Sequence, residues 1–283
     1  MPSATLLGQS ILSGLFIGGL YALMGLGLSL AWGYLKLINL AHLAFAFLAA
    51  YVTYQFVGYA GLSPPVALLI VVPAFFLLGV ALQALYTRFA VGEFASLLVT
   101  FGIAVIVESL IQYFWTADFR KLQIEHGTAS LRIGTLFVPV IEALMLLVAA
   151  ALSLATWAWL RFTYLGKAMR ASAENPEIAA AFGIDPRRLA LLMSGIGTAY
   201  AGVAGVFIAL TSTLFPAQIF AWVGVVFAVV ILGGLGNPLG VLAAGLAIGV
   251  SESVTMAVTE PTWAPLVAFT LLILVLILRP GRI

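Results

Sequence analysis

Residues 8–31 read GQSILSGLFIGGLYALMGLGLSLA, a run without one charged side chain. A helix needs about 20 consecutive apolar residues to cross the hydrocarbon core of a bilayer. The run therefore predicts a membrane-spanning helix. Its glycines indicate close packing, because small side chains let helix backbones approach each other in lipid. No Lys or Arg precedes the run and it is too long for a cleavable signal peptide, so we expect it to remain in the mature protein.

The composition of the whole chain is also typical of a protein embedded in a membrane. Of its 283 residues, 64% are hydrophobic and 8% are charged, whereas a soluble domain has about 45–50% apolar and about 25% charged residues. So few charges cannot cover a water-exposed surface, and the sequence predicts an integral membrane protein. The net charge of +2 is too small to suggest nucleic acid as a partner. Without cysteine and with two histidines, the chain offers little to a metal, and we expect no cofactor.

Further apolar runs follow the first along the whole chain. They cover residues 38–57, 66–86, 96–115, 138–160, 190–210, 219–233, 239–258 and 263–279. Because they are continuous rather than alternating, they favour helices over a β-barrel. The sequence thus predicts an all-α, polytopic transmembrane bundle of about nine spans, with 1–283 as a single transmembrane domain. The run 219–233 is short, which leaves open a re-entrant segment and eight spans.

The distribution of basic residues favours nine spans, because cytoplasmic connections carry an excess of Lys and Arg. With the N-terminus outside and the C-terminus in the cytoplasm, nine basic residues lie inside and three lie outside. The inside set is Lys36, Arg88, Arg161, Lys167, Arg170, Arg187, Arg188, Arg279 and Arg282. The outside set is Arg120, Lys121 and Arg132. If 219–233 does not cross, the better arrangement gives seven inside and five outside.

The largest predicted cytoplasmic segment, 161–189, contains the signals of a short, doubly capped helix. Asn175 can cap a helix whose first residue is Pro176, and Glu177 then lies in the first turn, where the helix dipole favours it. Gly183 suits the position just after the helix, and Asp185 begins the next one. This helix of about 10 Å is either plain loop structure or a knob that docks into a cytosolic partner. Ile178 and Phe182 share one of its faces.

At this segment the sequence resembles a known family. The residues Gly166–Ala171, Glu174–Ala179 and Gly183-Ile184 are similar to the coupling region of branched-chain amino acid ABC transporter permeases. Further motifs of that family occur in order at Gly18–Leu23, Gly27-Leu28, Trp32-Gly33, Asn39–His42, Ala201–Gly205, Gly233–Gly240 and Arg279–Gly281. The chain departs from the family at Leu43 and Ala50, where Gly is usual, and at Asn237, where Ser is usual. The first two departures lie near the expected substrate path.

The resemblance implies the permease subunit of an ATP-driven importer in a bacterial inner membrane, working by alternating access. It implies a second permease subunit (identical or homologous), two cytosolic ATP-binding subunits and an external solute-binding protein. Branched-chain or other hydrophobic amino acids are the default substrates, although relatives carry other small organic solutes. The residues implied to couple transport to the ATPases are Arg170, Ala171, Glu174, Asn175, Pro176, Glu177, Ile178, Ala179, Phe182 and Gly183.

Four polar residues within or beside the spans are candidates for the translocation path. Asn39 and His42, three residues apart, are expected to share a helix face at the start of the second span. Glu108 and Glu252 lie well inside their spans, where carboxyl groups are costly and often functional. For each candidate the alternative is a hydrogen bond that only fixes helix packing. Gly245 and Gly249 place Glu252 on a close-packed helix face. Gln83 and Gln112 are weaker candidates, for which the same two roles, substrate path or helix packing, stay open.

Other functions fit the sequence less well. A stand-alone secondary transporter or channel would use Glu108 and Glu252 to couple ions, but it would not need the capped cytoplasmic helix. An intramembrane enzyme is weakly supported, because the chain has no histidine pair on one helix, no cysteine and no Gly-x-Ser-x-Gly elbow. Gly233–Gly240 lacks the Gly-Lys-Ser/Thr of a phosphate loop and instead predicts a tight turn at the membrane face. The outer loop 116–137 is either a solvated loop or a contact for a solute-binding protein.

Overall fold

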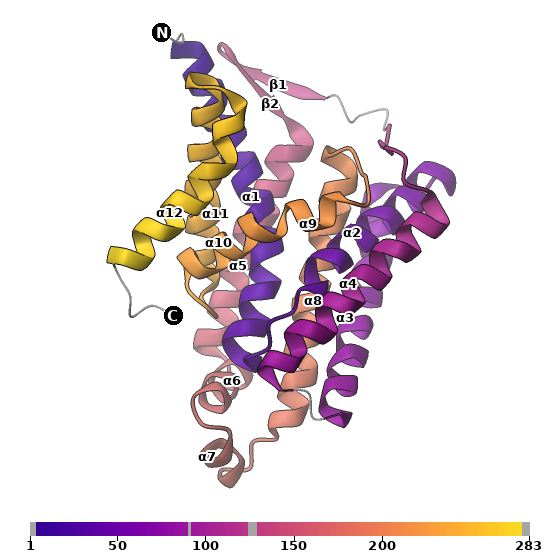
Figure 1. Ribbon diagram of the computed structural model, residues 1–283, viewed down its shortest axis with the longest axis vertical. Coiled ribbons are helices and arrows are strands. Elements are labelled where there is room, and N and C mark those ends of the chain that lie inside the picture. Colours follow the sequence, from indigo (N-terminus) through magenta and orange to yellow (C-terminus); the bar gives the residue numbers. More distant parts are fainter. Residues whose placement is uncertain (1–3, 90–91, 124–128, 279–283) are drawn as a thin grey trace.

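The computed structural model describes residues 4–89, 92–123 and 129–278, and these are mostly helical (Figure 1). The helices are α1 (Ala4–Leu35), α2 (Ala41–Tyr54), α3 (Pro64–Arg88), α4 (Glu93–Trp115), α5 (Val140–Phe162), α6 (Tyr164–Glu174), α7 (Pro176–Ala181), α8 (Pro186–Thr211), α9 (Gln218–Ala221), α10 (Val223–Gly233), α11 (Pro238–Val258) and α12 (Ala264–Leu278). A π-helical turn, η1 (Gln55–Tyr59), extends α2, and a 3₁₀ turn, η2 (Pro261–Trp263), precedes α12. Arg279 to Arg282 lie outside the described residues.

Seven described helices are long and apolar enough to cross a membrane: α1, α2 with η1, α3, α4, α5, α8 and α11. They coincide with seven of the nine predicted spans, so the polytopic helical bundle is confirmed. The other two predicted spans, 219–233 and 263–279, contain shorter apolar helices. The first of these is broken, because α9 ends at Ala221 and α10 begins after Trp222.

The broken segment nevertheless runs from one end of the bundle to the other. At its start, Leu214 pairs with Arg120 beyond the end of α4 through two backbone hydrogen bonds of 2.9 and 2.7 Å. At its end, the Gly236 amide donates to the carbonyl oxygen of Ser29, near the opposite end of α1. Figure 1 shows α9 at mid-height between these ends. Residues 212–237 therefore connect α8 and α11 along the length of the bundle.

One feature of the mostly helical fold was not predicted from the sequence. Strands β1 (Ser130–Ile133) and β2 (Leu136–Pro139) form an antiparallel hairpin within the predicted outer loop. The loop between them begins with Gly134 at φ +62°, the left-handed conformation that hairpin turns with an initial glycine require. Gln9 holds the hairpin against α1, because its side chain exchanges two hydrogen bonds with the Phe137 backbone. Glu125 and His126 of the same loop lie outside the described residues.

Glycines bring α1 and α11 into close contact. Gly14 and Gly18 of α1 face Gly245 and Gly249 of α11, and a methyl group added to Gly249 would overlap the Gly14 carbonyl oxygen. This is the small-residue packing that membrane helices use, and it confirms the close-packed face predicted for α11. On its other sides α1 contacts α8, which also packs on α2 and α3 at the centre of the molecule.

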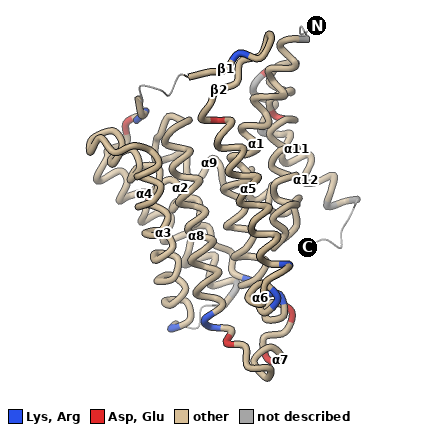
Figure 2. Tube along the Cα trace, turned by 180° about the vertical axis from the view of Figure 1, so that it is seen from behind, with Lys and Arg blue, Asp and Glu red and all other residues tan. Residues whose placement is uncertain are grey.

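Charged residues gather at the two ends of the molecule, and the middle of the trace is almost free of them (Figure 2). The basic residues at the end that carries α6 and α7 are Lys36 just after α1, Arg88 at the end of α3, Arg161 in the last turn of α5, Lys167 and Arg170 in α6, and Arg187 and Arg188 at the start of α8. Those at the other end are Arg120 and Lys121 after α4 and Arg132 in β1. An uncharged belt between two charged ends is the pattern expected of a protein that crosses a bilayer.

Candidate docking helix and polar sites of the bundle

Helix α7 begins as the sequence predicts. The Asn175 side-chain oxygen accepts hydrogen bonds from the backbone amides of Glu177 and Ile178, at 3.1 and 3.0 Å. Pro176 occupies the first position, where its missing N–H costs nothing. Glu177 lies in the first turn, where a negative charge is favoured by the helix dipole.

Helix α7 also ends at the predicted residue. Gly183 has φ +82°, and its amide donates to the carbonyl of Ala180. The next amide, of Ile184, donates to the carbonyl of Ala179. This pair of bonds is a Schellman motif, which satisfies the last carbonyls of a helix and needs a residue in the left-handed conformation. Asp185 then caps α8 by accepting from the amides of Arg187 and Arg188.

The exposed face of α7 is apolar. Ala179 is 3% exposed and faces the protein, whereas Ile178 is 58% exposed and Phe182 is 83% exposed. Figure 1 shows α7 at the tip of the molecule, beyond the ends of all the long helices. Two large apolar side chains on a rigid helix that projects into water form a surface suited to burial in a partner.

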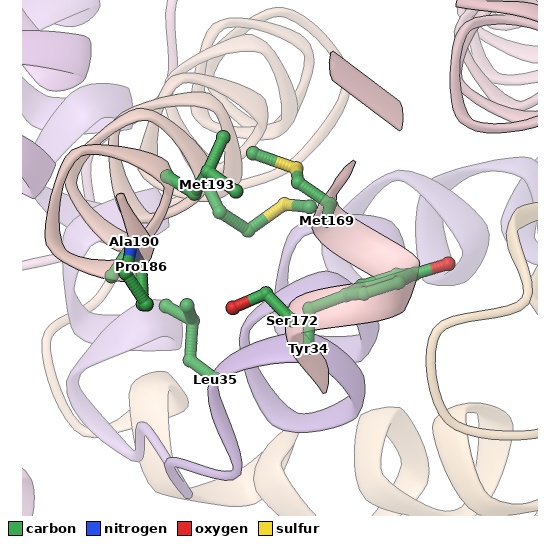
Figure 3. A pocket seen from close by; sticks show the side chains of 8 residues that line it. Tyr34, Leu35, Met169, Ser172, Pro186, Ala190 and Met193 are labelled. Atoms are coloured by element: carbon green, nitrogen blue, oxygen red, sulfur yellow. The ribbon is translucent and has the colours of Figure 1, made fainter. Parts of the chain in front are cut away.

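Helix α6 anchors α7 to the bundle and carries the remaining predicted coupling residues, Arg170, Ala171 and Glu174. Thr163 caps α6 by accepting from the Gly166 amide, and Met169 is buried against α8. Figure 3 shows Met169 and Met193 side by side above a small pocket that Tyr34, Leu35, Ser172, Pro186 and Ala190 also line. Arg170, Ala171 and Glu174 themselves are exposed. A displacement of α7 would therefore be transmitted through α6 to α1 and α8.

The expectation that Asn39 and His42 share a helix face is wrong. Residues 36–39 are not helical, and α2 begins only at Ala41. The hydroxyl groups of α4 hold this stretch outside the helix, because Thr100 donates to the Ile38 carbonyl and accepts from the Leu40 amide. Asn39 is buried, and its side-chain oxygen has no hydrogen-bond partner among the described residues.

His42 serves the packing of α2 against α1. Its ring is 1% exposed, and Nε2 lies 3.0 Å from the Met24 carbonyl oxygen, which can only accept, so Nε2 carries the proton. The Cε1 edge of the ring lies against Gly27, where an added methyl group would overlap it. These contacts match the packing alternative for His42.

Glu252 is also held by a packing interaction. Its side chain is buried at 6% exposure, and the Tyr21 hydroxyl of α1 donates to its carboxylate at 2.9 Å. The ring of Tyr21 lies edge-on to the ring of Trp222, the residue between α9 and α10. Sequence reasoning found Glu252 but missed Tyr21 and Trp222, because neither the pairing of α1 with α11 nor the break can be seen in an apolar run.

Glu108 lies in a different environment on α4. It is half-buried and accepts a hydrogen bond of 3.3 Å from Gln112, which is exposed. Phe101, one heptad before Glu108, contacts the ring of Phe220 in α9. Glu108 and Gln112 thus form a polar pair on the same side of α4 as Phe101. The structure brings Asn39 and His42 together through a backbone hydrogen bond, whereas Glu108 and Glu252 have separate partners.

Gly233–Gly240 forms the predicted tight turn. Gly234 and Gly236 have φ of +87° and +71°, which favour glycine. Asn237 caps α11 by accepting from the Gly240 amide, and the Gly236 amide also donates to the Ser29 hydroxyl. Within the described part of the chain no group of His, Asp and Glu side chains is arranged to hold a metal ion.

Comparison with known proteins agrees with this architecture. Residues 10–276 match the family model described as the branched-chain amino acid transport system permease component. LivH of Salmonella typhimurium, a high-affinity branched-chain amino acid transport permease, is 24% identical over 97% of this chain and 94% of its own length. BraD of Pseudomonas aeruginosa is 26% identical over the same shares, and LivM of Escherichia coli is 27% identical over 92% of this chain and 67% of its own. No solved structure matches the chain.

The family model covers nearly the whole of the bundle described above, from the first span to the last apolar helix. The chain is therefore a multi-pass inner-membrane protein and a permease component of an importer, and it belongs to the branched-chain amino acid ABC transporter permease family.

Proposed function

We propose that this chain is the membrane-spanning subunit of an ATP-driven importer and that segment 161–189 couples it to cytosolic ATPase subunits. The proposed cargo is branched-chain amino acids or related small organic solutes, which is the cargo named for the relatives LivH and BraD. The observation that carries the coupling role is the exposed apolar face of α7, where Ile178 and Phe182 project from a helix capped at both ends.

The proposed orientation places α6 and α7 in the cytoplasm and the hairpin outside. The excess of basic residues at the α7 end supports it, because positively charged connections are retained on the cytoplasmic side. ATP is available on that side, as the coupling role requires.

The proposed partners follow from the two exposed ends. Two ATP-binding subunits would meet α7, and a second permease chain, identical or homologous, would complete the path. That LivH and LivM both match this chain supports a homologous partner. An external solute-binding protein would meet the hairpin, where Leu131, Ile133 and Phe137 are each more than half exposed.

The proposed mechanism is alternating access. ATP-driven closure of the ATPase pair would shift α7 and α6, and with them the ends of α1 and α8. The pair of Glu108 and Gln112 on α4 supports a substrate path or a subunit contact beside this helix, because carboxyl and amide groups are costly to expose to lipid. A stand-alone secondary transporter is less well supported, since the Tyr21 hydroxyl already engages Glu252.

The test replaces the exposed apolar face of α7. The double variant Ile178→Ser, Phe182→Ser should lose co-purifying ATPase subunits and ATP-dependent uptake in proteoliposomes, while membrane insertion is retained. Tyr164→Ser is the matched control, because Tyr164 is 92% exposed on the same segment but lies at the start of α6. Normal ATPase recovery by the double variant would show that α7 does not dock. Solute uptake by the chain alone, without ATP, would establish a secondary transporter instead.

A further inference from the structure

An open pocket lies where three long helices end, on the side of the molecule that carries α6. The end of α1, the end of α5, α6 and the start of α11 surround an open cavity of about 380 Å³. Its lining residues are Tyr34, Trp157, Leu160, Arg161, Arg170, Gly236, Asn237 and Pro238. In Figure 3 the Tyr34 hydroxyl points away from the small methionine pocket, so the two pockets lie on different sides of this tyrosine. Since α1, α5 and α11 are candidate spans, this pocket lies at the level of lipid headgroups.

Two arginines from different helices line this pocket. Arg161 comes from the last turn of α5 and Arg170 from the middle of α6. Among the described residues the one ion pair is that of Arg188 with Asp185, so neither arginine has a carboxylate partner there. Glu174, one turn after Arg170, is not close enough to pair with it. The pocket also receives the start of the 21-residue helix α11, whose dipole adds positive potential.

The walls of the pocket fit a molecule with an anionic head and apolar tails. The guanidinium carbon of Arg161 lies 5.3 Å from the centre of the Trp157 ring, which orients the arginine. Trp157 and Leu160 belong to the last turns of a span, and tryptophan is the residue that membrane proteins place at the headgroup level. The Tyr34 hydroxyl donates to the Gly236 carbonyl and fixes the loop that forms the opposite wall. Arginines bind phosphate oxygens with paired, charge-assisted hydrogen bonds.

We propose that this pocket binds the phosphate of an anionic phospholipid from the leaflet on the α7 side. Arg161 and Arg170 would hold the phosphate oxygens, and the acyl chains would extend along the lipid-facing side of Trp157. Because Arg170 lies on the helix that anchors α7, the bound lipid would brace the coupling element. This assigns Arg170 to the lipid rather than to the ATPase.

The test measures lipid retention by the full chain purified in mild detergent. Native mass spectrometry would count phosphatidylglycerol bound at graded excess, with phosphatidylcholine of the same acyl chains as the neutral probe. The double variant Arg161→Gln, Arg170→Gln should retain phosphatidylglycerol at least about tenfold more weakly, the factor that loss of one charged hydrogen bond produces. The control is the double variant Arg88→Gln, Arg187→Gln, which removes the same charge from another pocket on the same side of the molecule. This variant should retain phosphatidylglycerol as the wild type does.

A second variant guards against misfolding. Asn237→Asp keeps a good helix cap and favours the helix dipole, yet it puts a negative charge in the pocket wall. It should melt no lower than the wild type and still retain less phosphatidylglycerol. Equal losses in both arginine pairs would show diffuse surface charge, and binding of inorganic phosphate as tight as that of phosphatidylglycerol would show a simple anion site. Loss of ATPase subunits with unchanged lipid retention would show a protein contact. Each of these results would overturn the proposal.

Discussion

Among the described residues, the Tyr21 hydroxyl is the one hydrogen-bond donor to the buried carboxylate of Glu252 across the α1–α11 contact. The substitution Tyr21→Phe removes the hydroxyl group, so the buried carboxylate oxygen of Glu252 loses its hydrogen bond. We expect the free energy of unfolding to fall by about 1–3 kcal/mol, the usual cost of an unsatisfied buried polar group. Unfolding by SDS in mixed micelles measures this change.

Glu252→Gln is the matched variant for that interaction, because the amide oxygen still accepts from Tyr21. We expect stability and transport to remain close to those of the wild type. If transport is lost while stability is kept, the carboxylate acts in the path and the packing interpretation of Glu252 is wrong. Uptake in proteoliposomes and melting in detergent, measured on one preparation, separate the two results.

The contact between α1 and α11 depends on the absence of side chains at its glycines. Gly249→Ala would press a methyl group into the backbone of Gly14 and Gly18, and only separation of the helices relieves it. We expect a loss of about 1–3 kcal/mol, as for overpacking elsewhere. Gly102→Ala on α4 is the control, because nothing lies within 4 Å of the added methyl group. It should raise stability by about 0.5–1 kcal/mol, and equal effects in both variants would contradict the packing argument.

Helix α7 depends on the left-handed conformation of one residue. Gly183→Ala costs about 1–2 kcal/mol locally, because a Cβ clashes with its own backbone at φ +82°. We expect the end of α7 to fray and ATPase co-purification to fall several-fold. Gly183→Asn should retain more of the ATPase, since asparagine adopts this conformation more readily. Ala and Asn variants that both recover the ATPase fully would show that the shape of α7 does not matter for docking.

The elements that sequence predicted well are those specified by neighbouring residues. Apolar runs predicted the long helices, and Asn175, Gly183 and Asp185 predicted the ends of α7 and the start of α8, because caps are local hydrogen bonds. The break at Trp222 and the non-helical stretch around Asn39 lie against residues that are distant in the sequence, namely Tyr21 and Thr100. The charges of the loop 116–137 do not indicate its hairpin, although Gly134 between the short stretches Ser130–Ile133 and Leu136–Pro139 is typical of a turn. Glu252 was found, but its role depended on a donor 231 positions away.

At the scale of the whole molecule, the direction of α11 decides how many times the chain crosses. Leu214 lies beside Arg120 at one end of the bundle, and Gly236 lies beside Ser29 toward the other. Helix α11 then returns to the first end, where Thr259 follows it. Helices α8 and α11 therefore run in the same direction, so we expect 212–237 to cross the membrane between them, even though α9 and α10 are both short.

Accessible cysteines test this arrangement cleanly, because the natural chain has none. With nine crossings, Thr213→Cys and Thr259→Cys should both react with a membrane-impermeant maleimide in sealed spheroplasts. Ala180→Cys on α7 should react only after permeabilisation, since it lies on the basic side that the positive-inside rule places in the cytoplasm. All three positions are exposed. If 219–233 only re-enters, Thr213→Cys reacts from outside and Thr259→Cys does not, because the two sites then lie on opposite faces of the membrane.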